Sequence, residues 1–380
     1  MRVFLFRVVF CLLVGCLTED LNNQIAMGYN VSTMRILGIE TSCDETAISL
    51  INVNKRGIEV ERNLVSSQID IHAKYGGVVP EVAARMHVEV MVPLLQETMG
   101  RKFKADDIDA IAVTQGPGLI TSLLVGIETA KTLSYVWNKP IIPVNHMEGH
   151  LFSSWLDSDE LKVDRKDIFP AIVLLVSGGH TELILMTGYG KYKKIGATRD
   201  DAVGEAFDKV AKLLKLGYPG GPIISERAAE GNPKEVELPR PMLHSKNFDF
   251  SFSGLKTAVR YHVIDKKLRE RNINNIAASF QEAAVDVLTQ KTMRAVEQYK
   301  AKSVIIGGGV AANKKLRKEL LIAADRFGIE FFCPKMKYAG DNAAMIALAG
   351  YYQWDSMSRD KQKSLLKTWK KLEPVSDFDL

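Results

Sequence analysis

Short apolar runs alternate with polar, glycine-containing turns along most of the chain, beginning at about residue 35. Residues 36–39 form an apolar run that is typical of a buried strand, and residues 46–53 predict a returning strand. The residues between them, 41–45, carry mainly hydroxyl and carboxylate groups. Two strands joined by such a short polar segment predict a β-hairpin with a polar tip.

The same plan returns in the second half of the chain. Residues 171–176 and 181–186 predict two strands on either side of a tight polar turn at 177–180. Each hairpin is followed later by a strand, a glycine turn and a helical pattern. These segments are 110–113, 115–118 and 119–137 in the first copy, and 303–306, 307–309 and 311–327 in the second.

This internal duplication predicts an α/β protein with two similar lobes around a cleft, and with the two hairpin tips at that cleft. The predicted division has an N-terminal extension (1–33), an N-terminal lobe (34–145), a C-terminal lobe (146–352) and a basic C-terminal tail (353–380). The C-terminal lobe carries a helical insertion at about 200–300, in which residues 200–216 and 274–299 predict helices.

Composition narrows the possible functions only slightly. A length of 380 residues fits two compact lobes, and the net charge of +5 permits a polyanionic partner without requiring one. The four cysteines include no C-x-x-C pair, which gives zinc-ribbon and thioredoxin functions no support. For the basic segment 359–371, a solvated helix face is the simplest interpretation.

The first 33 residues stand apart from this pattern. Two arginines flank an apolar run at residues 8–17, which resembles a short secretory signal and is too short to span a membrane. A second methionine, Met34, comes directly before the first predicted strand. We therefore expect a dispensable extension or a mis-assigned start and a cytoplasmic protein, with mitochondrial or other organelle targeting as the alternative. No other part of the sequence predicts a membrane span.

Two histidines, His146 and His150, are spaced so that both project from one helix face, as two ligands of one metal do. Asp341 offers a carboxylate, and two imidazoles with a carboxylate suit zinc or iron(II). The zinc-protease pattern places a glutamate directly after the first histidine, whereas Glu148 comes two residues after it. The alternatives are that both histidines simply pack in the core, and that Asp341 caps the helix that follows it.

Glycine turns form a second candidate site. The turn Ser177-Gly178-Gly179-His180 presents backbone N–H groups that can hold phosphate or carbonyl oxygens. The three glycines 307–309 precede a helix, whose positive end also favours anions. The sequence contains no P-loop motif.

Acidic residues form a third group. Asp44 and Glu45 lie in the first hairpin, and Glu205 and Asp208 share a face of the helix predicted over residues 200–216. Such carboxylates can bind ribose hydroxyls, hold a cation or move protons. The apolar residues at 202, 206 and 210 equally fit an ordinary amphipathic helix with a solvated acidic face.

Six motifs together resemble the tRNA adenosine threonylcarbamoyltransferases, formerly described as glycoproteases. They are residues 38–46 (GIETSCDET), 76–81 (GGVVPE), 116–118 (GPG), 146–150 (HMEGH), 176–181 (VSGGHT) and 340–342 (GDN). The resemblance extends from about Met34 to about Tyr352. The histidine of the SGGH turn is similar to the bacterial and mitochondrial branch of that family.

The resemblance implies an actin-like fold of two duplicated ribonuclease-H-like lobes. It implies transfer of the threonylcarbamoyl group from threonylcarbamoyl-AMP to N6 of the adenosine next to the anticodon in tRNAs that read ANN codons. It implies one divalent metal, Fe²⁺ or Zn²⁺, on His146, His150 and Asp341. The implied contacts to the adenylate are Leu175, Val176, Ser177, Gly178, Gly179, Asp208, Gly221 and Asn313.

The acceptor of the amine proton stays open in this scheme, with Glu45 and His180 as the candidate catalytic residues. The partners that the resemblance implies are tRNA and, as in bacterial relatives, a paralogous actin-like subunit and a small P-loop ATPase, with no membrane. Mitochondrial relatives act without such subunits.

Three other functions compete with this hypothesis. A sugar or acetate kinase on the same fold would have no use for the histidine pair. A metalloprotease is disfavoured by the position of Glu148, and a non-catalytic scaffold would not need the candidate metal ligands.

Overall fold

A computed structural model describes residues 33–380 apart from 55, 159–160, 162–164, 266–269 and 379. The predicted extension, residues 1–33, therefore lies outside the described residues except for its last position. Within the described part, no helix combines the length and the apolar character that crossing a bilayer requires.

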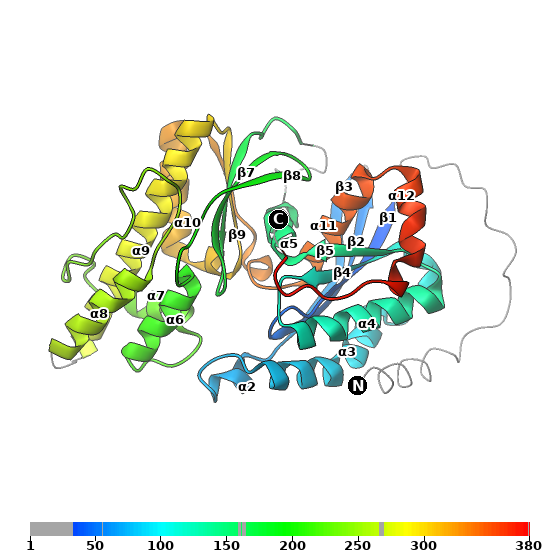
Figure 1. Ribbon diagram of the computed structural model, residues 1–380, viewed down its shortest axis with the longest axis horizontal. Helices are drawn as coiled ribbons and strands as arrows, with labels where there is room; N and C mark the ends of the chain where they lie inside the picture. The colour runs from blue at the N-terminus through cyan, green and yellow to red at the C-terminus, as the bar shows by residue number, and fades with distance from the viewer. Residues whose placement is uncertain (1–32, 55, 159–160, 162–164, 266–269, 379) are drawn as a thin grey trace, which may run out of the picture. The chain divides into compact units, whose positions relative to one another are not determined.

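Two five-stranded mixed sheets contain the described strands (Figure 1). The first has the order β3-β2-β1-β4-β5 and the second β8-β7-β6-β9-β10. The first three strands of each order pair antiparallel, and the last three pair parallel. The duplication predicted from the sequence is therefore present strand for strand.

The strands of the first sheet are β1 (Met34–Glu40), β2 (Glu45–Asn54), β3 (Gly57–Ser67), β4 (Ala110–Gly116) and β5 (Ile141–Asn145). Those of the second are β6 (Ala171–Val176), β7 (Thr181–Gly188), β8 (Lys191–Ala197), β9 (Ser303–Gly307) and β10 (Glu330–Phe332). The four edge strands β3, β5, β8 and β10 were not predicted. The residues of β3 and β8 are largely half-buried or exposed and lack the continuous apolar run of the inner strands.

By contacts the chain divides into two units. One comprises Met1–Gln68, Val79–Val163 and Asn342–Asp379; the other comprises Ile69–Val78, Asp164–Asp341 and Leu380. This division differs from the predicted lobes at both ends of the C-terminal lobe. Residues 146–158 and the segment after residue 341 belong to the first unit, where helix α5 contacts β4, β5 and α11.

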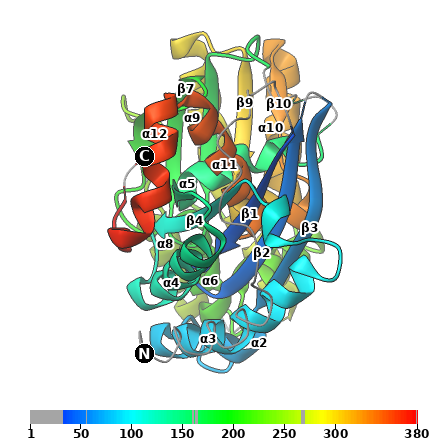
Figure 2. The same ribbon diagram turned by 90° about the vertical axis from the view of Figure 1, so that its right-hand side faces the viewer.

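Helices cover both faces of the first sheet: α3 (Pro80–Met99) and α4 (Ile120–Trp137) on one face and α11 (Ala343–Ser356) on the other (Figure 2). Neighbouring residues of β1 show this, because side chains alternate along a strand. Ile39 lies beside Gly126 of α4, whereas a Cβ on Gly38 would lie 2.2 Å from the carbonyl oxygen of Ala343. Glycine at position 38 therefore allows α11 to lie close to the sheet.

The second unit packs its helices around an apolar core that includes β6 and β9. These helices are α6 (Val203–Leu213), α7 (Gly220–Ala229), α8 (Ser253–Asp265), α9 (Glu270–Tyr299) and α10 (Lys314–Phe327). Helices α6 and α9 correspond to the two predicted for the insertion. The short helices are α2 (Ile69–Ala73), α5 (His146–Phe152) and α12 (Arg359–Ser364).

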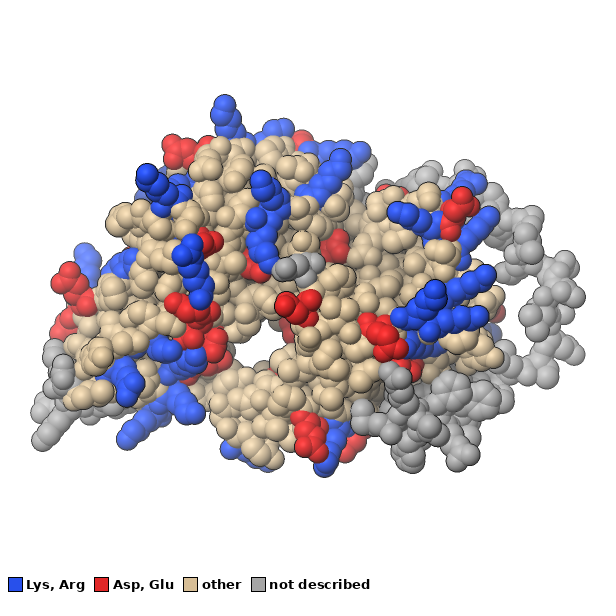
Figure 3. Space-filling view, viewed as in Figure 1, with Lys and Arg blue, Asp and Glu red and all other residues tan. Residues whose placement is uncertain are grey.

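The C-terminal segment packs onto the first unit. Leu372 is buried in the core that α3 and α4 help to form. The ring centroid of Trp369 lies 5.1 Å from the ring centroid of Tyr135 on α4. Basic side chains gather over α12 (Figure 3), and six basic residues between 359 and 371 are exposed. The predicted solvated basic face is therefore present at residues 359–371. Its segment is anchored to the first unit by Trp369 and Leu372.

Residues 373–378, which we call the C-terminal strap, lie along the ends of β4 and β5. The backbone N–H of Val375 donates to the carbonyl oxygen of Gln115 at 2.9 Å, and the side-chain amide of Asn145 donates to that of Phe378 at 2.7 Å. A Cβ on Gly116 would lie 1.8 Å from the carbonyl oxygen of Val375. The strap can therefore lie here only because residue 116 has no side chain.

Gly116→Ala should lower the free energy of unfolding by about 1–3 kcal/mol, because the new methyl group displaces the strap. Urea unfolding followed by circular dichroism measures this. In a chain that ends at Leu372 the same substitution should lower the free energy of unfolding much less. An equal loss in the full-length and the shortened chain would contradict the explanation. Gly188→Ala is the control, since its Cβ would meet only Lys191 Cδ at 3.7 Å.

Lys291 of α9 is buried, and its ammonium group donates to Ser245 Oγ at 2.9 Å and to the carbonyl oxygen of Asn247 at 3.2 Å. Burial, together with a smaller effect of the nearby Arg294, lowers the pKa of Lys291 from 10.5 to about 8. The lysine therefore holds the segment between α7 and α8 at an electrostatic cost.

The stabilisation that Lys291 provides should increase as pH rises from about 8 to about 10.5. In that range the unfolded chain keeps a proton that the folded chain has released, so stability rises with pH. The difference in unfolding free energy between the wild type and Lys291→Met, measured from pH 7 to 10.5, should grow in favour of the wild type. Parallel curves would contradict this. Lys209→Met is the control, because hydrogen bonds to Asp201 and Glu205 raise the pKa of Lys209, so its difference should not grow over this range and should begin to fall near pH 10.5.

Candidate metal centre and substrate pocket

Helix α5 begins at the residue that follows β5, and both histidines of the HMEGH motif lie on it. Asn145 caps this helix, because its side-chain oxygen accepts the backbone N–H groups of Met147 and Glu148. The spacing of four residues places His146 and His150 on one face, with ring centroids 4.6 Å apart. His150 is fully buried and His146 is 7% exposed.

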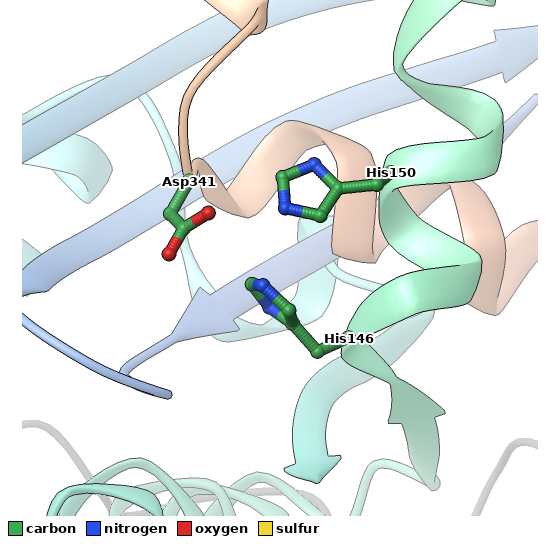
Figure 4. Close-up of side chains that lie close together, drawn as sticks. All are labelled: His146, His150 and Asp341. Atoms are coloured by element: carbon green, nitrogen blue, oxygen red, sulfur yellow. The ribbon is translucent and has the colours of Figure 1, made fainter. Parts of the chain in front are cut away.

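Asp341 joins the two histidines, and Figure 4 shows the three side chains pointing toward one another. One ligand atom from each of the three lies within 4.8 Å of the others. Asp341 precedes Asn342, whose side chain accepts the backbone N–H of Met345 and so caps α11. The alternative that Asp341 caps α11 is therefore wrong, since the next residue does so.

The donor set fits one metal ion. Two imidazole nitrogens and one carboxylate oxygen are the ligands of many zinc sites, and they are also the set that holds non-haem iron(II). The ligand atoms are close enough to share one ion. Among the residues that the structure describes, this is the group of three or more metal-binding side chains that comes together.

Glu148 does not share this group. Its carboxylate accepts a hydrogen bond from the side-chain amide of Gln353 on α11, at 2.6 Å. The carboxylate therefore links α5 to α11, which agrees with the prediction that Glu148 lies on another face of the helix than the histidines.

The turn between β6 and β7 contains Ser177, Gly178, Gly179 and His180. Ser177 Oγ accepts the backbone N–H groups of Gly179 at 3.3 Å and His180 at 3.0 Å. The backbone N–H of Ser177 donates to the carbonyl oxygen of His180 at 2.8 Å. The sequence predicted an open nest of N–H groups, and this is wrong for two of them because the serine hydroxyl accepts both.

A pocket of about 780 Å³ opens within the second unit, beside this turn. Four of the predicted adenylate contacts line it: Gly178, Asp208, Gly221 and Asn313. Gly309, from the predicted glycine turn after β9, lines it as well. The pocket therefore collects residues from β6–β7, α6, α7 and the start of α10, which are far apart in the sequence.

Hydrogen bonds fix the polar residues of this pocket. Asp208 accepts the backbone N–H of Gly220, at the start of α7, at 2.7 Å. The side-chain amide of Asn313 donates to Ser225 Oγ at 3.0 Å and to Gln281 Oε1 at 2.8 Å. Asn313 Oδ1 accepts the backbone N–H of Leu316, which makes Asn313 the N-cap of α10. The rotamer of Asn313 is therefore determined before any ligand binds.

The other predicted site residues lie elsewhere. Leu175 and Val176 are fully buried in β6, so they can offer a ligand only backbone atoms. Glu45 is the first residue of β2, and its carboxylate accepts Ser67 Oγ–H at 3.4 Å. Neither Glu45 nor His180 belongs to the pocket lining or to the His/His/Asp group.

Sequence reasoning missed several pocket residues. Gln281 and Ser225 hold Asn313, and Gly204 lines the pocket beside Gly178. A Cβ on Gly204 would lie 2.5 Å from the carbonyl oxygen of Ser177, so this glycine allows α6 to approach the turn. The one available signal was a polar residue, Gln281, on an otherwise apolar face of the helix that was predicted over 274–299.

Two sheets of equivalent strand order, each covered by helices, define a protein of the actin-like fold, and His146, His150 and Asp341 form a group that suits a metal. Sequence comparison specifies the family. The profile of the tRNA N6-adenosine threonylcarbamoyltransferase family matches residues 59–348. The chain belongs to this family, which confirms both the resemblance seen in the motifs and the assignment as a transferase.

Relatives with that name cover most of the chain. The protein of Carboxydothermus hydrogenoformans is 50% identical over 319 residues, which are 84% of this chain and 92% of the relative. That of Kosmotoga olearia is 49% identical over 84% of this chain and 93% of the relative. That of Burkholderia ambifaria is 50% identical over 83% and 91%, respectively.

Solved structures confirm the predicted fold. HypF of T. kodakarensis aligns with a TM-score of 0.56 at 14% identity, over 87% of this chain and 49% of that one. A full-length HypF in its phosphate- and nucleotide-bound form aligns with a TM-score of 0.55 at 13% identity, over 86% and 47%. At this identity the likeness shows the actin-like fold alone.

The adjacent glycines 220 and 221 at the start of α7 should respond in opposite ways to alanine. A Cβ on Gly220 would lie 2.6 Å from Asp208 Cα, so Gly220→Ala should destabilise the protein by about 1–3 kcal/mol. A Cβ on Gly221 meets nothing within 4 Å, so Gly221→Ala should be neutral or stabilise α7 by up to about 1 kcal/mol. Thermal and urea unfolding of both variants measure this, and equal losses would contradict the close packing of α7 on α6.

Proposed function

We propose that this chain transfers the threonylcarbamoyl group from threonylcarbamoyl-AMP to N6 of the adenosine next to the anticodon in tRNAs that read ANN codons. The products are N6-threonylcarbamoyladenosine and AMP. The observation that carries the proposal is a His/His/Asp group in a chain that belongs to a transferase family acting on tRNA by its name.

The pocket of the second unit holds the adenylate in this proposal. Its volume of about 780 Å³ lies within the range of about 300–1,000 Å³ that small-molecule sites usually have. Gly178, Gly221 and Asn313 approach the nucleotide, and the Asp208 carboxylate accepts hydrogen bonds from ribose hydroxyls. The backbone of residues 175–179 lies along the threonylcarbamoyl end of the adenylate. The remaining N–H group of that turn, that of Gly178, stabilises charge on the attacked carbonyl.

His146, His150 and Asp341 hold one divalent metal, Fe²⁺ or Zn²⁺, in this proposal. The bound ion supplies Lewis acidity and orientation to the acyl group. The two imidazoles must be neutral to bind it.

The reaction exchanges one bond at the carbamoyl carbon. The N6 amine of the adenosine forms a bond to this carbon, the bond from the carbon to the phosphate oxygen breaks, and AMP leaves with the electron pair. Glu45 or His180 accepts the proton that N6 loses. The anticodon loop can present the base, because proteins read single-stranded loops whose bases are splayed out.

The partners in this proposal are tRNA and, as in bacterial relatives, a paralogous actin-like subunit and a small P-loop ATPase. The net charge of +5 and the exposed basic residues of the C-terminal segment are compatible with a polyanionic substrate. We expect the enzyme to act in the cytoplasm, or in an organelle such as the mitochondrion if residues 1–33 target it there.

Radioactive threonine tests the proposal. The protein is incubated with labelled threonine, bicarbonate, ATP, tRNA and the enzyme that forms the adenylate, with and without the two bacterial partner proteins. Label should enter tRNA, and it should do so only in the presence of this chain. His146→Ala should abolish the transfer while leaving the fold intact, because one metal ligand is lost.

Matched variants and substrates make the result specific. His244→Ala removes a histidine far along the chain from the HMEGH motif and should transfer label at the wild-type rate. A phosphorylated sugar or a cleaved peptide, in place of labelled tRNA, would favour a kinase or a protease. Full transfer by a metal-stripped His146→Ala protein would refute the role of the metal.

A further inference from the structure

Glu40, the last residue of β1, is a fully buried carboxylate beside His146. Its Oε1 accepts the backbone N–H of Ser42 at 2.5 Å, and its Oε2 accepts Thr114 Oγ1–H at 2.5 Å. The same Oε2 lies 3.1 Å from Nδ1 of His146. A buried charge is tolerated when several donors satisfy it, and these three groups surround both oxygens.

The sheet topology brings these groups together. Strands β1, β4 and β5 are parallel neighbours, so their carboxyl ends lie at one edge of the sheet. Glu40 ends β1, Thr114 is near the end of β4, and His146 follows β5 directly. Three segments that are distant in the sequence therefore deliver a carboxylate, a hydroxyl and an imidazole to one point.

The hydrogen bonds determine which nitrogen of His146 carries the proton. An ionised carboxylate can only accept, so Nδ1 of His146 donates to Glu40 and Nε2 is left as the nitrogen with a lone pair. Ser42 Oγ, 3.2 Å from the same Nδ1, is a second polar neighbour of that side of the ring. Histidines that bind a metal through one nitrogen usually donate from the other to a carboxylate or carbonyl.

A purely structural role for Glu40 explains less. Joining β1 to β4 needs no charge, because the backbone ladder already pairs Ile39 with Val113, and burying a carboxylate costs several kcal/mol before its partners offset that cost. A neutral residue would fill the same volume without this cost. What only the carboxylate supplies is an acceptor that fixes the tautomer and the rotation of the His146 ring.

We propose that Glu40, supported by Thr114 and Ser42, is a positioning residue that fixes His146 in the Nδ1–H tautomer and directs its Nε2 to the metal shared with His150 and Asp341. This rests on the metal centre of the proposed function. Glu40 itself contacts neither the metal nor the substrate in this scheme. Its effect on the reaction passes through the imidazole.

Glu40→Gln reverses the tautomer, for a geometric reason. The backbone N–H of Ser42 can only donate, so it retains the amide oxygen on its side and turns the amide NH₂ toward Thr114 and His146. The NH₂ group then donates to Nδ1 of His146, and the ring proton moves to Nε2, the atom needed for the metal. A carboxylate-to-amide change beside a catalytic histidine acts in this way in other enzymes.

Cobalt(II) is the probe for metal affinity, measured by visible absorption with a competing chelator on the full chain. The wild type should bind one Co²⁺, and Glu40→Gln should bind it about 10- to 100-fold more weakly. Glu61→Gln is the matched control, because it removes the partner of Arg35 at the opposite end of β1 and should bind like the wild type. His146→Ala should lose the cobalt spectrum of the wild type.

Nitrogen NMR of the metal-free protein, with ¹⁵N-labelled histidine, gives a readout that does not depend on metal or activity. His146 should show the Nδ1–H tautomer in the wild type and in Glu61→Gln, and the Nε2–H tautomer in Glu40→Gln. Loss of the signal in His146→Ala assigns it. A residue with only a structural role would change stability without changing the tautomer.

The outcomes separate this proposal from the proposed function. Wild-type cobalt affinity together with an Nδ1–H ring in folded Glu40→Gln overturns the role of Glu40 and leaves the metal centre standing. A wild type that binds no cobalt overturns both. If Glu40→Gln does not fold, an Nε2–H ring at His146 in the wild type is sufficient to overturn the proposal, and an Nδ1–H ring supports it.

Discussion

The parallel pairing of β1, β4 and β5 is the constraint on which the first unit depends. Because these strands run in one direction, their carboxyl ends meet at one edge, and each chain segment that leaves the sheet there begins close to the others. Helix α5 starts at this edge and carries both histidines. Helix α11, with Asp341 directly before its cap, packs against the same strands. The metal-compatible group therefore follows from strand direction and helix capping.

The second unit uses the same strand order for a different purpose. The turn between β6 and β7 lies where the first sheet has its β1–β2 turn, and the helices around it leave a pocket instead of a cluster of imidazoles. Glycines at 204, 220 and 308 allow helices and turns to approach backbone atoms closely, which a Cβ at any of these positions would prevent. The duplicated fold thus has two equivalent sheet edges. The residues at the first edge include the two histidines, and those at the second surround a pocket.

Much of this architecture was predictable from the sequence because it depends on the local order of apolar and polar residues. Apolar runs gave the inner strands of both sheets, and their repetition gave the duplicated fold. The spacing of His146 and His150 indicated one helix face. The association of Asp341 with them came only from family resemblance, since the 190 residues 151–340 lie between His150 and Asp341 and no periodicity spans that interval.

Other features could not be predicted because they depend on tertiary packing. Ser177 Oγ accepts two N–H groups of the turn that a ligand would otherwise bind, and residue types alone do not reveal this. The cap of α11 falls on Asn342 instead of Asp341, a difference of one residue that rests on backbone geometry. Gln281 is polar within a long helix, and only the fold shows that it faces Asn313.

The discontinuous first unit has a consequence for biosynthesis. A ribosome releases β1 to β5 early, but the helix that covers one face of this sheet and the strap along its edge are made only after residues 164–341 of the second unit. A nascent or prematurely terminated chain therefore carries both imidazoles without the aspartate from position 341. Such fragments lack the complete His/His/Asp group, which exists only once the chain has been made through residue 341.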